Sequence, residues 1–204
     1  MIGIIDYGGG NVLAFVNVLE RLGHDYKVIK TPRDIKNISG LIFPGVGSWD
    51  ATVRRLHSSG LWDFIIDFVQ QGRPLLGVCL GMQILLEHSD EGNEKGLGLI
   101  PGKVKLLPSE VKPHMGWNIL ELSSNFTPFS QFHGHEFYHI HSYYCDPDVS
   151  DVNMGRVTYE GNTFPTFIQR GNLIGCQFHP EKSHNSGEKF INEFVNICYA
   201  VDCQ

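Results

Sequence analysis

The apolar positions in the first half of the chain fall into short runs that alternate with helical patterns. Four β-rich runs predict buried strands, at residues 2–6, 26–29, 41–43 and 74–78. Apolar residues at helical spacing predict helices between them, from about Val12 to Gly23, near residues 50–56 and over residues 61–71. This alternation is typical of a parallel sheet with helices on both faces.

The second half of the chain is β-rich. Six further strands are predicted, at residues 104–107, 119–122, 136–144, 156–159, 164–169 and 173–178. A hairpin turn is expected at Arg170-Gly171-Asn172, and a closing helix over residues 183–201. No linker or repeat divides the chain. We therefore expect one α/β domain over residues 1–204, with an open, mostly parallel sheet, helices on both faces and a smaller antiparallel β extension.

Composition and charge exclude several classes of function. The net charge is −6, from 16 basic and 22 acidic side chains, and no Lys/Arg cluster suggests nucleic acid as a partner. The apolar runs are far shorter than a membrane span, and the N-terminus has no basic region of a signal peptide. The five cysteines are odd in number and form no CxxC pair, so a reducing cytoplasm is the natural setting.

The clearest candidate for catalysis is Cys79, which ends the strand predicted at 74–78. A helical pattern follows at once, and glycines stand two places before and after it, at Gly77 and Gly81. A nucleophile elbow needs this arrangement, because its sharp turn leaves no room for neighbouring side chains. The helix N-terminus behind the sulfur favours thiolate over thiol. The alternative is a buried structural cysteine, but flanking glycines contribute nothing to such a residue.

A cysteine nucleophile needs a base and a group that orients the base. His179 and Glu181 lie two residues apart at the end of the last predicted strand, so their side chains project the same way in an extended segment. Pro180 favours that extended backbone. We predict that Glu181 orients His179, which faces Cys79. The alternative is a surface His and Glu at a strand end.

Acyl transfer also needs hydrogen-bond donors for an oxyanion. The segment Pro44-Gly45-Val46-Gly47 follows the third predicted strand, and its glycines leave backbone N–H groups open to a ligand. We expect one donor from the peptide at Val46 or Gly47 and the other from the N–H of Leu80. The alternative is a plain turn into the next helix.

No metal or cofactor is expected. Gly8-Gly9-Gly10 lacks the spacing and the lysine of a nucleotide-binding loop. Several histidines crowd into residues 133–141, as H-G-H-E-F-Y-H-I-H, but this spacing suggests side chains that alternate between strand faces and do not converge on an ion.

The motifs G-V-C-L-G-M-Q at 77–83 and F-H-P-E at 178–181 resemble those of the class I, or triad, glutamine amidotransferases. That resemblance implies their flavodoxin-like fold. Further motifs are similar to those of the glutaminase subunit of imidazole glycerol phosphate synthase: DYGGGN at 6–11, PGVG at 44–47, GLGLIPG at 96–102, PHMGWN at 113–118, HSYY at 141–144 and HPEKS at 179–183.

The resemblance implies a glutaminase in which Cys79 attacks glutamine and forms a thioester, while His179 and Glu181 move the proton. It also implies that Gly45, Gly47, Gln83, Ser142 and Tyr143 hold the substrate.

The implied partner is a (β/α)8-barrel cyclase, which uses the ammonia to make imidazole glycerol phosphate and an aminoimidazole carboxamide ribotide in histidine biosynthesis. The residues placed at this interface by the resemblance are Asn11, Met115, Trp117, Tyr138 and Lys182. An exposed Trp is typical of an interface hot spot, although Trp117 could also pack in the core.

Three alternatives remain open at this point. The chain could be a paralogue that supplies ammonia to a surface-sugar amidation or to another synthase. It could be a free-standing cysteine hydrolase that acts on γ-glutamyl bonds and is active alone. It could also be an inactive binding partner, although intact Cys79, His179 and Glu181 argue against that.

Overall fold

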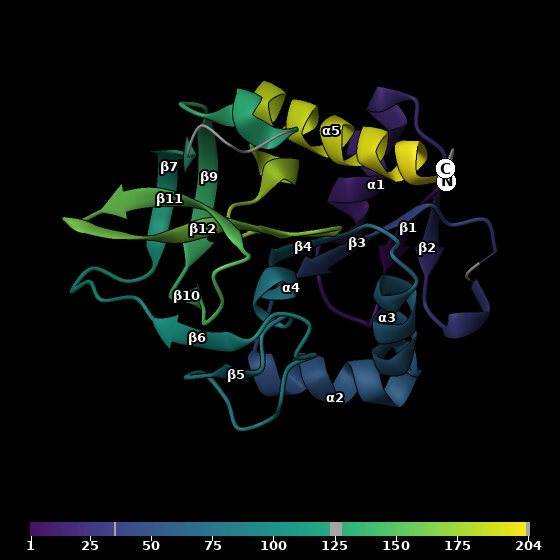
Figure 1. Ribbon diagram of the computed structural model, residues 1–204, viewed down its shortest axis with the longest axis horizontal. Helices are drawn as coiled ribbons and strands as arrows, with labels where there is room; N and C mark the ends of the chain where they lie inside the picture. Colours follow the sequence, from purple (N-terminus) through teal and green to yellow (C-terminus); the bar gives the residue numbers. More distant parts are fainter. Residues whose placement is uncertain (35, 123–127, 203–204) are drawn as a thin grey trace.

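The computed structural model describes residues 1–34, 36–122 and 128–202, and a central sheet runs through the middle of the molecule (Figure 1). Five of its strands are parallel: β1 (Ile2–Ile5), β2 (Tyr26–Ile29), β3 (Gly40–Gly45), β4 (Leu75–Cys79) and β13 (Leu173–Cys176). The predicted parallel sheet is confirmed. These strands are hydrophobic because side chains on both of their faces are buried.

Three antiparallel strands extend the sheet beyond β13. They are β12 (Asn162–Arg170), β11 (Asn153–Tyr159) and β8 (Glu121–Leu122). The full order is β2-β1-β3-β4-β13-β12-β11-β8. The expected hairpin is present, since Arg170 pairs with Leu173 and Gly171 between them has a φ of 56°. The antiparallel extension that we predicted is therefore confirmed.

Helices cover both faces of the sheet, as predicted (Figure 1). On one face lie α1 (Val12–Leu22) and α5 (His184–Asp202), and their apolar sides form a core with Ile4, Ile42 and Val78. On the other face lie α2 (Trp49–Ser59) and α3 (Leu61–Gln70), which pack against alternate residues of the same strands. Two cores thus hold the strands from both sides. Among the described helices, none combines the length and the apolarity that a membrane span requires.

A three-stranded sheet flanks the main sheet. It consists of β10 (Tyr143–Pro147), β6 (Gly102–Leu106) and β5 (His88–Ser89). A separate two-stranded antiparallel ribbon consists of β7 (His114–Ile119) and β9 (Glu136–His141). Short 3-10 turns complete the described elements: η1 (Pro32–Asp34), η2 (Phe129–Phe132) and η3 (Pro180–Lys182).

Three predicted elements are wrong in detail. The single strand expected at 136–144 is two strands in different sheets, because the chain leaves β9 after His141 and enters β10 at Tyr143. The strand expected at 119–122 is likewise divided between the end of β7 and β8. The helix after Cys79 is one turn, α4 (Leu80–Gln83), and the apolar residues Ile84 to Leu86 are buried in the turns that follow it.

Candidate active site

Cys79 lies at the carboxyl end of β4, where the strand turns into α4. Its φ of 54° and ψ of −111° are unusual for a residue with a side chain, and such strain concentrates at functional sites. Cys79 as a whole residue is 9% exposed and lines a cavity, so it is enclosed but within reach of a small molecule. The predicted nucleophile elbow is therefore the observed local geometry.

The glycines around Cys79 are explained by close backbone contacts. A Cβ on Gly81 would lie 2.0 Å from the carbonyl oxygen of Phe43, and one on Gly77 would lie 2.7 Å from that of Gly81. A Cβ on Gly45 would lie 2.2 Å from the backbone nitrogen of Gly81. A side chain at Gly45 or Gly81 would push α4 away from β3, and one at Gly77 would push α4 away from β4. The glycine pattern therefore serves the tight packing of α4 against both strands.

The sheet order brings the other predicted groups to the same edge. Cys79 pairs with Gly45 in the parallel register of β3 and β4, so Val46 and Gly47 leave the sheet beside the sulfur. On the other side, β13 lies next to β4, and His179 follows its end. Cys79 thus lies between the predicted oxyanion loop and the predicted base, because the carboxyl ends of parallel strands meet at one edge.

His179 and Glu181 form a buried ion-pair geometry. Nδ1 of His179 lies 2.8 Å from Oε1 of Glu181, and the two side chains are only 3% and 1% exposed. Burial alone lowers the pKa of His179, but hydrogen bonds with Cys79 and Glu181 outweigh it and raise this pKa to about 10. A protonated imidazole beside the sulfur favours the thiolate form.

A cavity of about 360 Å³ opens in front of the sulfur of Cys79. This volume is within the usual range of small-molecule sites. Its lining residues are Val46, Gly47, Cys79, Leu80, Gln83, Glu91, Ile140, His141, Ser142, Tyr143, His179 and Lys182. The predicted residues Val46, Gly47 and Leu80 thus share one cavity with the sulfur. The N–H of Leu80 belongs to the first turn of α4, where backbone donors have no partner within the helix.

The residues expected to hold substrate are not all equivalent in the structure. Gln83, Ser142 and Tyr143 line the cavity together with Gly47, whereas Gly45 lies behind it in β3, packed against Gly81. Gln83 is held in place by its own contacts, because its Nε2 donates to Oε1 of Gln177 at 3.0 Å.

Sequence reasoning gave no role to Gln177 or Glu91. Gln177 is fully buried, and its Nε2 lies 3.5 Å from the sulfur of Cys79. The signal was available, since Gln177 stands two places before His179 in an extended segment and shares its side. Glu91 carries a carboxyl group at the cavity wall, and burial, with a smaller effect of the nearby Asp50 charge, raises its pKa. Glu91 lies in a polar loop, where no sequence pattern distinguishes it from its neighbours, so it was not predicted.

Of the predicted interface residues, Lys182 lines the cavity and the other four lie outside its lining. Met115 and Trp117 are 62% and 45% exposed, so Trp117 does not belong to the core. Trp117 contacts Tyr138 across the ribbon, with ring centroids 6.0 Å apart. Lys182 is exposed beside the cavity, and Asn11 is half-buried immediately before α1.

The expectation that the histidines alternate between faces is wrong for His139 and His141. They are two residues apart in β9, so both point inward, and His114 in β7 joins them from the paired strand. Their ring nitrogens lie within 4.8 Å of one another. Of the cysteines, Cys79, Cys145 and Cys176 are unpaired, and Cys203 lies outside the described residues.

The sharp turn at Cys79, the His179–Glu181 pair and the sheet order are together typical of one class of enzyme. The chain belongs to the class-I glutamine amidotransferases, whose family model matches residues 3–197. Its fold is similar to a crystal structure of a glutamine amidotransferase, with a TM-score of 0.79 at 18% identity over 97% of this chain and 98% of that one.

Curated relatives narrow the assignment. The chain is 41% identical over 203 residues to imidazole glycerol phosphate synthase subunit HisH of Halalkalibacterium halodurans, with 95% of this chain and 94% of that protein covered. It is 43% identical over 199 residues to the subunit of the same name from Moorella thermoacetica, with 96% and 94% covered. The chain is a member of the HisH family, and the resemblance in its motifs is confirmed.

Proposed function

We propose that this chain is the glutaminase subunit of imidazole glycerol phosphate synthase. It hydrolyses glutamine to glutamate and ammonia in the cytoplasm, acting as one domain over residues 1–204. It passes the ammonia to a cyclase subunit, a (β/α)8 barrel, for histidine biosynthesis. The observation that carries the proposal is that Cys79 and His179 both line the 360 Å³ cavity, with Glu181 hydrogen-bonded to His179 from the buried side.

The geometry supports a two-step acyl transfer. The sulfur of Cys79 attacks the side-chain carbonyl carbon of glutamine, and the resulting oxyanion accepts hydrogen bonds from the N–H of Leu80 and a peptide N–H at Val46 or Gly47. His179 gives its proton to the amide nitrogen, so the C–N bond breaks and ammonia leaves. A glutamyl thioester remains on Cys79.

Water then completes the cycle. His179 is now neutral and takes a proton from a water molecule, which attacks the thioester carbon. The C–S bond breaks, glutamate leaves, and the sulfur and the imidazolium return to their starting state. Glu181 keeps the imidazole in one orientation through both steps, because its Oε1 lies 2.8 Å from Nδ1.

The polar groups of the cavity suit the ends of a glutamine molecule. Glu91 supplies a carboxyl group at the wall, which in its ionised form attracts the α-ammonium group. The backbone of Ser142 and Tyr143 and the side chain of Gln83 lie at the same cavity and offer hydrogen bonds. We assign these four residues to substrate recognition.

The partner surface that we propose is the outward face of the β7–β9 ribbon. Strand alternation places Met115, Trp117, Tyr138 and Ile140 on this face, and register pairs Met115 with Ile140 and Trp117 with Tyr138. Exposed apolar side chains in one group are typical of a protein contact. Ile140 also lines the cavity, so the contact and the site are continuous. Ammonia released at Cys79 therefore emerges beside the partner.

The experiment that tests the proposal combines this chain with a histidine-pathway cyclase. Glutaminase activity is measured with and without the cyclase and its nucleotide ligand, and we expect stimulation by the loaded cyclase. A rate that does not change on mixing would exclude the pairing and favour another ammonia-requiring synthase.

A cysteine variant separates the chemistry from the assembly. We expect Cys79→Ala to abolish synthesis from glutamine but to retain synthesis from added ammonium in the complex. Cys145→Ala is the matched control, because this buried thiol in β10 does not line the cavity, and it should retain both activities. Loss of both activities in Cys79→Ala would show that the cysteine is structural.

A further inference from the structure

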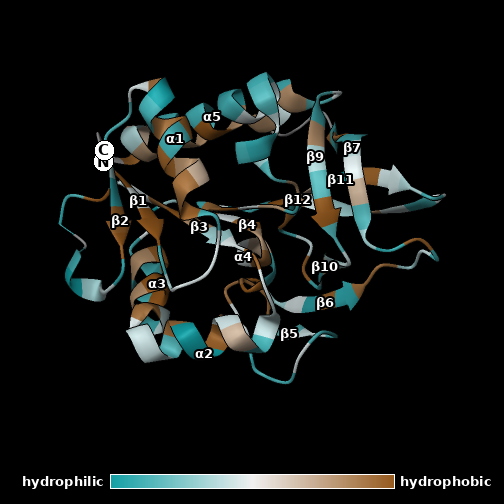
Figure 2. Ribbon diagram, turned by 180° about the vertical axis from the view of Figure 1, so that it is seen from behind, coloured by the Kyte–Doolittle hydropathy of each residue, from teal (hydrophilic) through white to brown (hydrophobic). Residues whose placement is uncertain are grey.

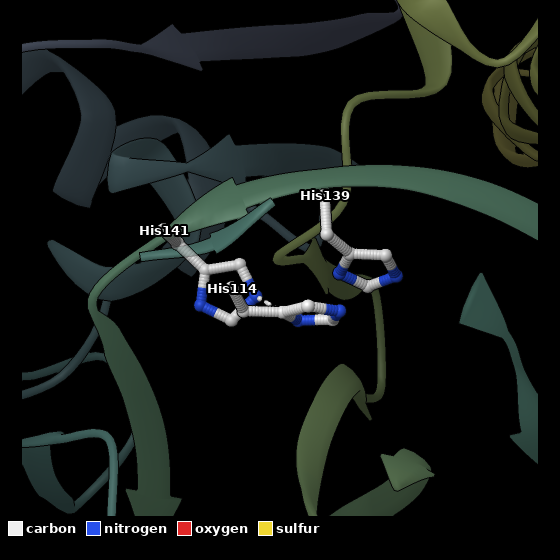
Figure 3. A group of neighbouring side chains, drawn as sticks. All are labelled: His114, His139 and His141. Atoms are coloured by element: carbon white, nitrogen blue, oxygen red, sulfur yellow. Dashed lines mark hydrogen bonds between the residues drawn. The ribbon is translucent and has the colours of Figure 1, made fainter. Parts of the chain in front are cut away.

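We propose that His114, His139 and His141 form a binding site for one divalent transition-metal ion, for which Zn²⁺ is the best match. The three imidazoles lie on the inward face of the β7–β9 ribbon, opposite the face proposed for the partner. Figure 3 shows the rings of His114 and His139 side by side, with His141 next to His114.

The spacing of the nitrogens suits a tetrahedral ion. Nδ1 of His114 lies 3.2 Å from Nε2 of His141. Two imidazole nitrogens on a tetrahedral zinc ion are about 3.3 Å apart, since each Zn–N bond is about 2.0–2.1 Å. A nitrogen of His139 lies within 4.8 Å of the other two, and its ring, which stacks on His114, would turn to complete the set.

His141 is already oriented as a metal ligand. Its Nδ1 lies 2.8 Å from the carbonyl oxygen of Tyr143, so Nδ1 carries the proton and Nε2 presents its lone pair to the cluster. A ligating histidine usually donates its other ring N–H in this way, which fixes the tautomer. The hydrogen bond between His114 and His141 would be replaced by the two bonds to the ion.

His139 is the residue that a purely structural cluster leaves unexplained. Its side chain is fully buried, yet neither ring nitrogen has a hydrogen-bond partner among the described residues. Its ring stacks on His114 at 4.6 Å and meets Phe178 edge-on at 5.8 Å, so phenylalanine would satisfy the same packing with no buried polar atoms. Both ring nitrogens of His139 therefore lack a partner in the described part of the chain, and a metal ion bound beside the other two imidazoles would supply one.

The protonation state of the cluster favours binding. Burial lowers the pKa of His114 to about 4 and that of His141 to about 3. Burial, together with the charges that the neighbouring histidines would carry, also lowers the pKa of His139 well below its ordinary value. All three rings are therefore neutral near pH 7, the form in which imidazole binds metals.

A site with three imidazole ligands also has higher affinity for some metal ions than for others. Nitrogen ligands suit Zn²⁺, Cu²⁺ and Ni²⁺, whereas Mg²⁺ and Ca²⁺ prefer oxygen. Zn²⁺ accepts irregular tetrahedral geometry, and a water molecule can supply a fourth ligand. Gly116 stands opposite His139 in the register, and a Cβ there would meet no atom within 4 Å, which leaves open space beside the cluster. The ion would tie β7 to β9.

The test uses untagged full-length protein carrying Cys79→Ala, so that the thiol in the cavity cannot bind metal. Zn²⁺ is titrated by calorimetry, and Co²⁺ by the visible absorption of its tetrahedral complexes. We expect one ion per chain, visible bands without a sulfur charge-transfer band, and a higher Tm with Zn²⁺. Adding His139→Phe should weaken Zn²⁺ binding by more than about 100-fold. Loss of a group that only supports a ligand weakens metal binding by about 10- to 100-fold, and loss of the ligand itself should cost more.

The matched control is His57→Phe, which changes an exposed histidine on α2 and retains its ring stacking on Trp62. It should bind Zn²⁺ as the parent does. Binding that is absent in the parent, or equally strong with His139→Phe, would overturn the proposal. Should His139→Phe fail to fold, anomalous scattering from a Zn²⁺-soaked crystal of the parent decides, because density away from the three rings contradicts the site.

Discussion

Glu181 stands two residues after His179, and its Oε1 lies 2.8 Å from Nδ1 of that imidazole. Pro180 lies between them at the start of η3, so the pair is held on a short, stiff segment. Both side chains are almost completely buried. The hydrogen bond between the Glu181 carboxylate and the imidazole therefore lies in a low-dielectric surrounding, where its electrostatic energy is larger than in water.

The first prediction concerns the charge of that carboxylate. We expect Glu181→Gln to lower kcat for glutamine hydrolysis by about 10²- to 10⁴-fold, because the imidazole loses the group that holds its tautomer and stabilises its protonated form. Steady-state kinetics in the complex with the cyclase measures the effect. Glu188→Gln is the control, since this carboxylate on α5 pairs with exposed Arg21 and should not matter. Equal activities of the two variants would contradict the role of Glu181.

The second prediction concerns the titration of His179. Its pKa is raised from 6.5 to about 10, because hydrogen bonds with Cys79 and Glu181 outweigh the effect of burial. The nearby His139 and His141 are neutral near pH 7, since burial lowers the pKa of both. The folded state therefore binds the proton of His179 more tightly than the unfolded state does. The resulting stabilisation is complete below pH 6.5 and is lost as the pH rises towards about 10.

Removing the sulfur tests this interpretation. In Cys79→Ala the pKa of His179 should fall, because Glu181 alone then opposes the effect of burial. The nitrogen chemical shifts of the imidazole report its protonation by NMR, and urea unfolding at several pH values reports stability. The alkaline loss of stability should be smaller in the variant than in the parent. A neutral imidazole in the parent at pH 8 would contradict the prediction.

Much of the fold could be predicted because burial on both faces leaves a clear pattern. The strands of the parallel sheet are short apolar runs, and Gly23 ends α1 in the left-handed conformation that favours glycine. The boundary between β9 and β10 was not predictable in the same way. The chain changes sheets at Ser142, where neither glycine nor proline marks a break.

The candidate site likewise has parts that could be predicted from local sequence and parts that could not. Cys79, Gly77 and Gly81 stand together in sequence, so local geometry alone predicts the elbow. The contact of Gln177 with the sulfur depends instead on β13 lying beside β4, which pairs segments far apart in the chain. The histidine cluster was missed for a similar reason. In Figure 2, β9 carries both hydrophobic and hydrophilic residues, but only its pairing with β7 brings His114 to the others.

The third prediction concerns the packing of the elbow. A Cβ at Gly81 would lie 2.0 Å from the carbonyl oxygen of Phe43, and backbone cannot move aside as a flexible side chain does. We expect Gly81→Ala to lower the free energy of unfolding by about 3 kcal/mol or more. Gly161→Ala is the control, because Gly161 has a φ of 74° but no atom within 4 Å of an added Cβ, so only the backbone cost of about 1 kcal/mol applies. Equal losses in urea unfolding would contradict the packing argument.

The last prediction concerns the proposed partner surface. Trp117 is 45% exposed, stacks on His184 with ring centroids 5.2 Å apart, and lies next to Tyr138 and exposed Met115. Covering such a cluster with a partner buries a large aromatic area. We expect Trp117→Ala to raise the Kd for the cyclase by about 30-fold or more, which corresponds to about 2 kcal/mol at a hot spot. Calorimetric titration of one subunit with the other measures this change.

Trp62→Ala is the matched control for that measurement. It removes the same side chain from α3, which packs under the opposite face of the sheet from α5, well away from the β7–β9 ribbon (Figure 1). Trp62 stacks on His57, and this contact joins only α2 and α3. Loss of the Trp62 side chain should therefore lower the Tm and leave the Kd for the cyclase unchanged. A Trp117→Ala variant that folds with the parent's circular dichroism and binds the cyclase as tightly as the parent would place the contact elsewhere. Equal weakening by both variants would mean that loss of stability, and not loss of the contact, governs the affinity.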